Sequence, residues 1–549
     1  MNWIAIISIL IIVIYIISHE VKKRKLEQLK KSLENNWGKI KKETVYNFEI
    51  INQYFENSKN KKNAYHIISN QTKNDLDIDE LFKYLDRTSS KIGQQYLYYK
   101  IRVIEDSSKL LKFEKLTQLF ETDEKLRLNC QLELSKLNTN NAYDLEKLIH
   151  DEVIKKPSYQ KYLIPLSISV ILSFSLGFIK PIFFLLLMPI FMVNLVFHYK
   201  TKGYINYYLH AVNQLNKGLK VSEKLADYNA ITGHFSNLDF IKKIQEIRLK
   251  TKFISFEKQV NNEFAAFIWI IIELFKILFN IEAIVFYSFI DDITNKRKSI
   301  DELFQFIGEI DSAITVAAIK HQNKFICKPN FVSQKALSIK EATHPLIENC
   351  ISNSIDLTKK SVLLTGSNMS GKTTFIRTIA LNSILAQTLN IAFAKEFSIP
   401  FYKVYSSIRI SDNLFDDTSY YLKEVLTIKE LITISTKKDP CLFVLDEIFK
   451  GTNTTERIAG GKAILSYLNK GNNLVFVSTH DIELTELLEN NDFELYHFSE
   501  QIVANKLFFD HKLKNGKLKT RNAIKILDLY EYPQEIISDA EQTIKENFS

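Results

Sequence analysis

Apolar residues follow one spacing in the first 330 positions of the chain and another spacing afterwards. Between residues 20 and 155, and again between 200 and 325, they recur every three or four positions among many lysines and glutamates. This spacing places them on one face of a helix. After residue 330, short apolar runs alternate with helical stretches, which is typical of an α/β unit with a mainly parallel sheet. We therefore predict a domain boundary close to residue 330.

The first long apolar run occupies residues 3–18, and a basic cluster follows it at residues 22–25. A cleaved signal peptide carries its basic residues before the apolar run and a small-residue cleavage site after it, so the order does not fit one. It fits a helix that spans a membrane and ends in the cytoplasm, by the positive-inside bias. We predict a transmembrane helix at residues 1–20 and a helical segment at residues 21–160.

Two further apolar runs lie within residues 161–200, separated by Lys180 and Pro181. Each run is close to the ~20 residues that a helix needs to cross a bilayer. Lysines flank the pair on both outer sides, which favours the cytoplasm for both ends. We predict a transmembrane hairpin whose turn faces outward. A buried helical hairpin of a soluble domain remains the alternative.

A third apolar run, residues 264–290, contains Glu273, Lys276 and Glu282. Each ionisable group costs ~2.5–3.5 kcal/mol near the centre of a bilayer. One more span would also place the rest of the chain outside the cytoplasm. We therefore expect a largely buried helix of a soluble domain, or a helix that lies against the membrane, within a helical segment at residues 201–330.

A phosphate-binding loop follows the strand that we predict at residues 361–365. The stretch GSNMSGKT has the form G-x-x-x-x-G-K-[ST] between a strand and a helix. Its glycines let the backbone wrap around phosphate, so that N–H groups and the helix N-terminus face the anion. We expect Lys372 to reach the β- and γ-phosphates and the Thr373 hydroxyl to ligate Mg²⁺. The predicted ATP-binding residues are Gly366, Ser367, Asn368, Met369, Ser370, Gly371, Lys372, Thr373 and Thr374.

Two later strands end in residues suited to ATP hydrolysis. CLFVLDE ends in Asp446 and Glu447, and NLVFVSTH ends in His480. The first carboxylate can hold the magnesium shell, and its neighbour can polarise the attacking water. Because ligands of open α/β sheets collect at the carboxyl ends of the strands, these groups should lie beside the loop. We predict an ATP hydrolase in which Asp446 ligates the metal and Glu447 and His480 are catalytic.

Composition narrows the setting of this site. The cysteines stand far apart without a C-x-x-C pair, so a disulfide framework or a zinc site is not expected and a reducing cytosol is the natural environment. The net charge of +9 is modest for 549 residues. It permits binding to DNA or to anionic lipid without favouring either.

The stretch TGSNMSGKTTFIRTIALNSILAQ, residues 365–387, resembles the nucleotide loop of the MutS family of DNA mismatch repair ATPases. Asn368 and Met369 distinguish the loop of this family from other phosphate loops, which do not require these residues. LDEIFKGTNT, STHDIELTEL and ATHPLIE also resemble family segments, and YLDRTSSKIGQQYLYYKIR, residues 84–102, resembles the start of the family's helical core. The resemblance implies a helical core or lever region, here with transmembrane helices, followed by an α/β P-loop ABC-type ATPase domain at residues 331–549.

The resemblance also implies a dimer. SDNLFDDTSYYLKEV, residues 411–425, resembles a family loop whose serine touches the nucleotide of the partner subunit. The match gives that role to Ser419, although Asp417 replaces a glycine and Tyr420 and Tyr421 replace a Thr-Phe pair. It also places Cys350 where family members stack an aromatic side chain on adenine.

Residues 21–83 leave no room for the mismatch-reading and connector domains with which mismatch-recognising members begin. A membrane hairpin is also predicted where the family carries its levers and its DNA clamp. We therefore expect a multi-pass protein of the inner or plasma membrane, with its ATPase domain in the cytoplasm. It would bind ATP and Mg²⁺, form a homodimer, contact lipid, and open and close helical arms, with DNA kept open as a partner.

Two alternatives remain. The first is a mechanochemical membrane ATPase that acts on a protein or a lipid without DNA. The second is an ATPase similar to those of ABC transporters. No L-S-G-G-Q stretch precedes CLFVLDE, and three spans are fewer than the ~6 helices of a transport half, which weakens the second alternative.

Overall fold

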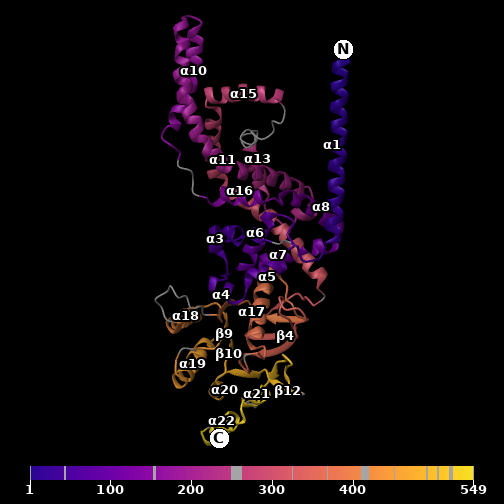
Figure 1. The fold of residues 1–549 in the computed structure, drawn as a ribbon, viewed down its shortest axis with the longest axis vertical. Helices are drawn as coiled ribbons and strands as arrows, with labels where there is room; N and C mark the ends of the chain where they lie inside the picture. The colour runs from indigo at the N-terminus through magenta and orange to yellow at the C-terminus, as the bar shows by residue number, and fades with distance from the viewer. Residues whose placement is uncertain are drawn as a thin grey trace. The chain divides into compact units, whose positions relative to one another are not determined.

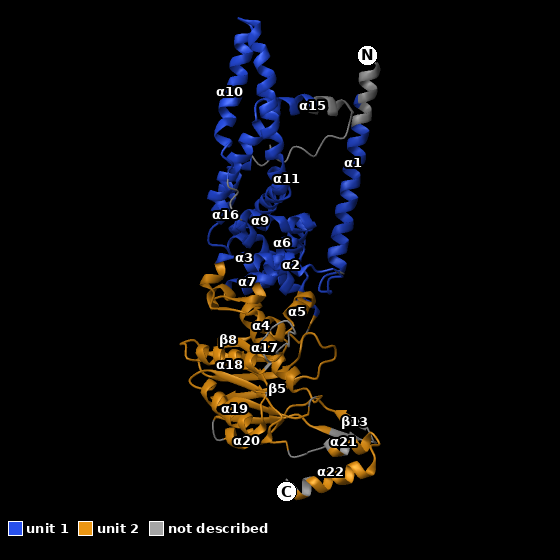
Figure 2. Cartoon of the chain, turned by 60° about the vertical axis from the view of Figure 1, so that its left-hand side comes forward, with its two compact units in different colours: residues 1–59, 86–99, 112–322 blue, residues 60–85, 100–111, 323–549 orange. Residues whose placement is uncertain are grey.

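The computed structural model describes most of the chain, which falls into two compact units (Figures 1 and 2). Unit 1 comprises residues 1–59, 86–99 and 112–322, and unit 2 comprises residues 60–85, 100–111 and 323–549. Two stretches of the predicted N-terminal helical segment thus group with the C-terminal part. The described residues are 2–42, 45–151, 156–248, 263–323, 325–367, 369–409, 420–449, 452–489, 492–503, 506–518 and 523–547.

The described secondary-structure elements of unit 1 are all helices, as the spacing of apolar positions predicts. Its long helices are α1 (Asn2–Asn35), α10 (Gln160–Gly177), α11 (Leu187–Ala226), α15 (Glu263–Leu278) and α16 (Ile281–Gln322). Short helices complete it: α2 (Phe48–Ile51), α3 (Gln53–Asn57), α8 (Glu124–Leu134), α9 (Leu145–His150), α12 (Asn229–Thr232) and α13 (Asp239–Gln245). Two more, α6 (Lys91–Arg102) and α7 (Ser107–Thr122), have residues in both units.

The core of unit 1 lies between α11 and α16, which pack along each other. Leu303 and Ile307 of α16 are fully buried there against Gly218 of α11. A Cβ atom added to Gly218 would lie 3.2 Å from Leu303 Cδ2, so the small residue lets the two helices approach closely.

The start of the predicted helical core is fixed by one buried carboxylate. Asp311 of α16 accepts hydrogen bonds from the backbone N–H groups of Ser89 and Ser90, both at 2.8 Å, and from the Ser90 hydroxyl at 2.6 Å. Burial raises the pKa of Asp311 to about 6. A Cβ atom at Gly93 would lie 2.0 Å from Asp311 Oδ2, so only glycine fits there. These contacts give a structural reason for the serines and the glycine of YLDRTSSKIGQQ.

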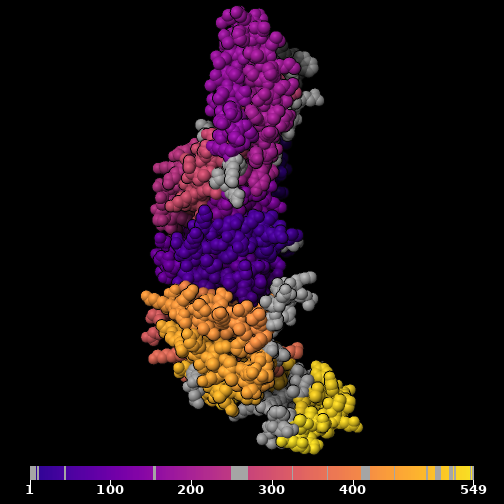
Figure 3. Space-filling model, turned by 90° about the vertical axis from the view of Figure 1, so that its left-hand side faces the viewer, coloured from indigo at the N-terminus to yellow at the C-terminus, as the bar shows by residue number. Residues whose placement is uncertain are grey.

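Helices α10 and α11 form a hairpin at the predicted residues, joined through a 3₁₀ turn at Pro181–Leu186, and its place in a membrane stays a prediction. In the part of the chain that the structure describes, two helices are long and apolar enough to cross a membrane, by length and composition alone: Gln160–Gly177 and Pro181–Ala226. Within unit 1 their side chains form a column of their own (Figure 3). Phe174, Phe178 and Leu185 are among the exposed apolar side chains on it.

The third apolar run is two helices instead of one. α15 ends at Leu278, Asn280 adopts a left-handed φ of 49°, and α16 begins at Ile281. The α16 part of the run is buried, with Phe286 and Phe289 fully enclosed. The α15 part exposes apolar side chains instead.

Unit 2 contains the predicted α/β architecture around a six-stranded sheet. Its strand order is β14-β11-β6-β10-β9-β8, and all neighbours pair in parallel except the edge strand β14. The strands are β6 (Ser361–Thr365), β8 (Lys403–Ser407), β9 (Cys441–Asp446), β10 (Leu474–Ser478), β11 (Phe493–His497) and β14 (Lys514–Asn515). The central strands are buried, as their near-continuous apolar sequences predict.

The sheet is accompanied by α17 (Lys372–Leu389), α18 (Tyr420–Ser435), α19 (Thr454–Leu468) and α20 (Ile482–Glu489). A second, mixed sheet has the order β3-β7-β4-β5. Its strands are β3 (Asn330–Phe331), β4 (Ala336–Ala342), β5 (Asn353–Thr358) and β7 (Glu396–Ile399). The remaining elements of unit 2 are β1 (His66–Ile67), α4 (Asn70–Asp75), α5 (Ile78–Leu85), β2 (Val103–Ile104), β12 (Glu500–Val503), β13 (Lys506–Phe509), α21 (Ala523–Leu529) and α22 (Gln534–Asn547).

Candidate nucleotide site

The glycine-rich loop joins β6 to α17, as predicted. Gly366 and Gly371 have φ angles of 141° and 112°, which side-chain-bearing residues rarely adopt. A Cβ atom at Gly366 would also lie 2.6 Å from the backbone oxygen of Phe498. The backbone can therefore curl as it does only because these two positions are glycine.

Lys372, the first residue of α17, is buried beneath the loop. Its Nζ donates to the backbone oxygens of Gly366 at 2.5 Å and Ser367 at 2.9 Å. The ammonium group is thus held by carbonyl oxygens where a phosphate-binding lysine is expected. Asn368 lies outside the described residues, so its predicted part in the loop stays a prediction.

A hydroxyl and a carboxylate meet at the end of β9. The Thr373 hydroxyl donates to Asp446 Oδ2 at 2.9 Å, and the Ser478 hydroxyl donates to the other oxygen, Oδ1. Parallel pairing of β9 and β10 sets Asp446 beside Ser478. Thr373 and Asp446 are therefore adjacent, as a shared magnesium shell requires, since oxygen ligands are those that Mg²⁺ prefers. Ser478 was not predicted, although it stands two residues before His480, which was.

Glu447 and His480 also meet. Glu447 Oε1 lies 3.0 Å from His480 Nε2, and the same nitrogen lies 3.4 Å from Lys372 Nζ. Glu447 has a left-handed φ of 58°, and its backbone N–H donates to the Ser478 oxygen at 2.9 Å. Backbone strain of this kind in a non-glycine residue is concentrated at functional sites. The three predicted polar groups form one connected chain at the mouth of the loop.

Glu424 supports this turn from α18. It is almost fully buried, and its Oε1 accepts a hydrogen bond from the Phe449 backbone N–H at 2.5 Å. Phe449 follows Glu447 by two residues and has a φ of 60°. Glu424 thereby fixes the backbone that carries Glu447. Ser419, before α18, lies outside the described residues, so its contact with a partner subunit stays a prediction.

A cavity of about 420 Å³ opens beside the loop. Cys350 lines it, at the position where the family resemblance puts an aromatic residue, together with Ile347, Phe498 and His511. His511 Nδ1 lies 3.0 Å from the Ser370 backbone oxygen, so this ring is tied to the loop. Apolar side chains and the rings of Phe498 and His511 beside a phosphate loop form a surface suited to a nucleobase. Phe498 and His511 carry no sequence signal that separates them from other residues of strand ends and turns.

Two aspartates after β1 connect α17 to the end of β8. Asp75 accepts hydrogen bonds from the Ser406 hydroxyl at 2.7 Å and the Arg409 backbone N–H at 2.9 Å. Asp77 binds the Arg409 guanidinium in two places, at 2.6 and 2.9 Å, and lies 3.2 Å from Arg377 of α17. The segment directly before residues 411–419 is therefore fastened to the helix that begins at the phosphate loop.

Known proteins resemble this chain over part of its length. Residues 362–547 match the family model of MutS domain V. The DNA mismatch repair protein MutS of Listeria welshimeri serovar 6b is 29% identical over 277 residues, which cover 48% of this chain and 32% of that protein. The protein of the same name from Bacillus licheniformis is 32% identical over 276 residues, 47% of this chain and 31% of that protein.

A third match extends further along the chain. The DNA mismatch repair protein MutS of Clostridium botulinum (strain Loch Maree / Type A3) is 28% identical over 348 residues, covering 60% of this chain and 36% of that protein. The chain thus spans about a third of the length of the curated relatives it matches.

Proposed function

The chain belongs to the MutS family through residues 362–547, and from this premise we propose that it is a membrane-anchored ATP hydrolase that works as a dimer. The observation that carries the proposal is the meeting of the polar ends of β9 and β10 at one phosphate loop. Thr373 and Asp446 are 2.9 Å apart, and Glu447 and His480 are 3.0 Å apart. Metal-assisted hydrolysis needs ligands for Mg²⁺ and a group that positions the attacking water beside a bound triphosphate, and the two pairs offer these.

The roles follow from the contacts. Thr373 and Asp446 would hold Mg²⁺, which when bound neutralises charge that develops on the phosphates. Lys372 would exchange its carbonyl partners for phosphate oxygens, because an anion with several oxygens is the stronger partner for an ammonium group. Glu447 would accept the proton of the attacking water, and His480 would orient that carboxylate.

The membrane anchor is supported by α10 and α11. The core helix of a soluble protein is mostly buried, whereas only 22% and 11% of the two apolar windows are buried. Both windows also lie far from the N-terminus, where a signal sequence would stand. We place the hairpin in the inner or plasma membrane, with α1, which exposes Ile14 and Ile16, as a further span. The nucleotide site then lies in the cytoplasm, where ATP is found.

The proposed dimer rests on the family resemblance. The proposal of DNA as a partner rests on the names of the relatives. In a dimer, Ser419 would touch the nucleotide of the partner subunit, and the ATP cycle would open and close the helical arms. The relatives named above are DNA mismatch repair proteins, so DNA is the first partner to test. The exposed hairpin favours a second candidate, an ATPase that acts on a membrane protein or a lipid.

The test is the rate of ATP hydrolysis by the full-length protein in detergent and in vesicles. Homoduplex, mismatched and branched DNA would each be added, and Glu447→Gln would serve as the blank. Stimulation by DNA supports a membrane-tethered DNA clamp. Stimulation by vesicles alone supports the second candidate. If the wild-type rate does not exceed that of Glu447→Gln under any condition, the proposed hydrolase is wrong.

A further inference from the structure

Helix α15 buries its charged face and exposes its apolar face, which is the reverse of what is expected for a helix at a water-exposed surface. Ile270, Ile271, Leu274 and Phe275 are exposed, and Phe275 leaves 56% of its surface uncovered. Glu273 and Lys276 are only 9% and 7% exposed, and Ile277 is buried with them. At about 100° per residue, the exposed apolar group lies on one side of the helix and the buried group on the other. Such a helix hides its charges and presents hydrocarbon.

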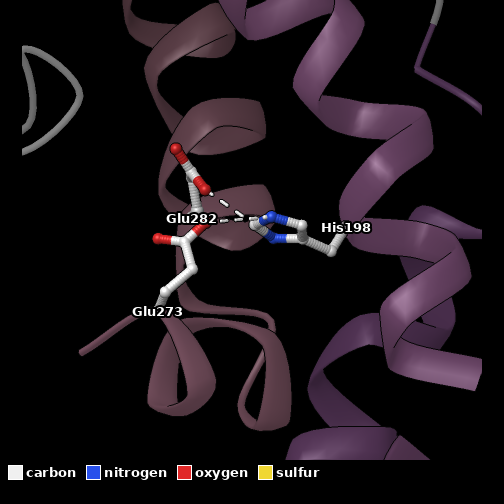
Figure 4. A group of neighbouring side chains, drawn as sticks. All are labelled: His198, Glu273 and Glu282. Carbon is white, nitrogen blue, oxygen red and sulfur yellow. Dashed lines mark ion pairs between the residues drawn. The ribbon is translucent and has the colours of Figure 1, made fainter. Parts of the chain in front are cut away.

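The charges of α15 belong to a cluster shared by α15, α11 and α16, defined as His198, Lys202, Glu273, Lys276 and Glu282. Figure 4 shows His198 with the two glutamates. His198 Nε2 lies 3.3 Å from Glu273 Oε1, and His198 Nδ1 lies 3.7 Å from Glu282 Oε2. The ammonium groups of Lys202 and Lys276 lie 2.9 and 3.4 Å from the Glu273 carboxylate. Because two lysines already compensate this carboxylate, the cluster is an ion-pair network and not a cation site.

A second set of contacts ties the end of α15 to α11. The Asn194 amide donates to the backbone oxygen of Leu278 at 2.7 Å, and the Asn280 amide donates to Asn194 Oδ1 at 2.7 Å. Asn194 and His198 are one helical turn apart on α11, so both attachments lie on the same face of that helix.

Helix α15 is attached to α11 at the point where the sequence of α11 changes from apolar to basic. Val193 and Val196 are exposed apolar residues of the hairpin, whereas Lys200 and Lys202 stand two and four positions after His198. Lysines at the end of an apolar run mark the boundary between hydrocarbon and headgroups. The ribbon of α15 also runs across the direction of α10 and not along it (Figures 1 and 2). If α10 and α11 span a bilayer, α15 therefore lies along its surface.

We propose that α15 is an interfacial helix whose exposed apolar face, Ile270, Ile271, Leu274 and Phe275, inserts into the headgroup boundary of a lipid bilayer. The occupant is lipid because the face continues the apolar surface of the hairpin at the level where that surface ends. Helices of this kind bury their apolar side about 5–10 Å into the boundary region. The proposal rests on the membrane anchor proposed above and adds a second, shallow contact with the same bilayer.

The test places a fluorescent label at one cysteine at a time in the full-length protein in vesicles. The variants are Phe275→Cys for α15, Ile171→Cys for the hairpin and Ile536→Cys for α22 of unit 2, all three exposed positions. Cys327 and Cys350, which are partly exposed, would first be replaced by serine so that they do not take up the label. The other two cysteines are buried and can stay. Quenching would be measured with iodide in the water and with nitroxide lipids labelled at a shallow or a deep acyl position.

We expect the label at position 275 to lose iodide quenching relative to the label at 536 and to respond more to the shallow nitroxide than to the deep one. The label at 171 should respond more to the deep one. Iodide quenching at 275 equal to that at 536 would overturn the interfacial helix while the response at 171 keeps the anchor. Protection at 275 from both iodide and nitroxides would also overturn it, because protein would then cover the face. If no nitroxide reaches the label at 171, the proposed membrane anchor itself fails.

Discussion

The carboxylate of Glu447 lies 3.0 Å from the imidazole of His480, and the left-handed backbone at Glu447 holds it there. In the mechanism proposed above, Glu447 would be the base and His480 the group that orients it. Glu447→Gln should preserve the shape of the side chain and the binding of ATP while lowering the hydrolysis rate roughly 100- to 10,000-fold, the usual worth of a general base. Single-turnover hydrolysis and binding of a fluorescent ATP analogue measure the two effects separately.

Glu486→Gln, on the exposed surface of α20, is the matched control and should hydrolyse ATP at the wild-type rate. His480→Gln should cost less than Glu447→Gln, because the histidine acts through the carboxylate. A greater loss for His480→Gln would reverse the two roles.

Lys372 supplies the positive charge of the loop from a buried position against two carbonyl oxygens. Lys372→Ala should therefore abolish ATP binding, since the carbonyl oxygens of Gly366 and Ser367 would then face the phosphates without a cation between them. Equilibrium binding of labelled ATP checks this result, with Lys438→Ala, at an exposed lysine, as the control. Equal affinities of the two variants for ATP would show that Lys372 does not contribute to ATP binding.

The chemical site could be predicted from the sequence because its residues stand at the ends of strands. In a parallel sheet those ends meet at one edge, so the order of loop, Asp446, Glu447 and His480 along the chain already implies their proximity. Phe498 and His511 could not be found in this way. They reach the cavity through contacts between distant segments, such as the hydrogen-bond distance from His511 to Ser370, which no local pattern encodes.

Contacts between distant segments also explain where the helical part of the structure differs from the prediction. Asp75 joins unit 2 through hydrogen bonds to β8, more than three hundred positions later in the chain, so residues 60–85 read locally as part of the N-terminal helical segment. For α15, periodicity shows two faces and does not say which one is buried. We expected charges within an apolar run to mean a largely buried helix or one against the membrane. The ion pairs of Glu273 with α11 bury the charged face and leave the apolar one exposed.

Asp446 holds the negative charge that a cation needs, and two hydroxyl groups already position its carboxylate. Asp446→Asn keeps the size of the side chain and removes the charge. We expect Mg²⁺ to strengthen ATP binding by the wild type and to have little effect on the variant, while both bind equally in EDTA. Titration of a fluorescent ATP analogue with and without EDTA measures this. Asp439→Asn, which only loses an ion pair with Lys403, is the control, and an equal gain from Mg²⁺ in Asp446→Asn would contradict the metal role.

The contact between Gly93 and Asp311 should make this glycine irreplaceable. A Cβ atom there would overlap Asp311 Oδ2, so Gly93→Ala should lower the free energy of unfolding of unit 1 by about 1–3 kcal/mol, the usual cost of overpacking. Gly203→Ala, on α11, meets nothing within 4 Å and should instead stabilise its helix by up to about 1 kcal/mol. Chemical unfolding in detergent compares the two. A stable Gly93→Ala variant would show that the serine–aspartate contacts shift freely.

The raised pKa of Asp311 predicts a pH dependence with a definite sign. Burial raises the pKa of Asp311 from its ordinary value of 3.8 to about 6, so between these values the folded state binds more protons than the unfolded one. The stability contributed by the protonated carboxyl is fully present below pH 3.8 and is lost as the pH rises through 6. At about 1.4 kcal/mol for each pKa unit, the loss is roughly 3 kcal/mol.

Asp311→Asn cannot titrate and should lack this loss. The difference in free energy of unfolding between wild type and Asp311→Asn, measured in detergent, should therefore shift against the wild type as the pH rises from 4 to 7. Using the difference cancels the titration of all other carboxylates, because both proteins contain them. A difference that is constant with pH would mean that Asp311 stays ionised in the fold. Its three hydrogen bonds from Ser89 and Ser90 would then outweigh the cost of burying the charge.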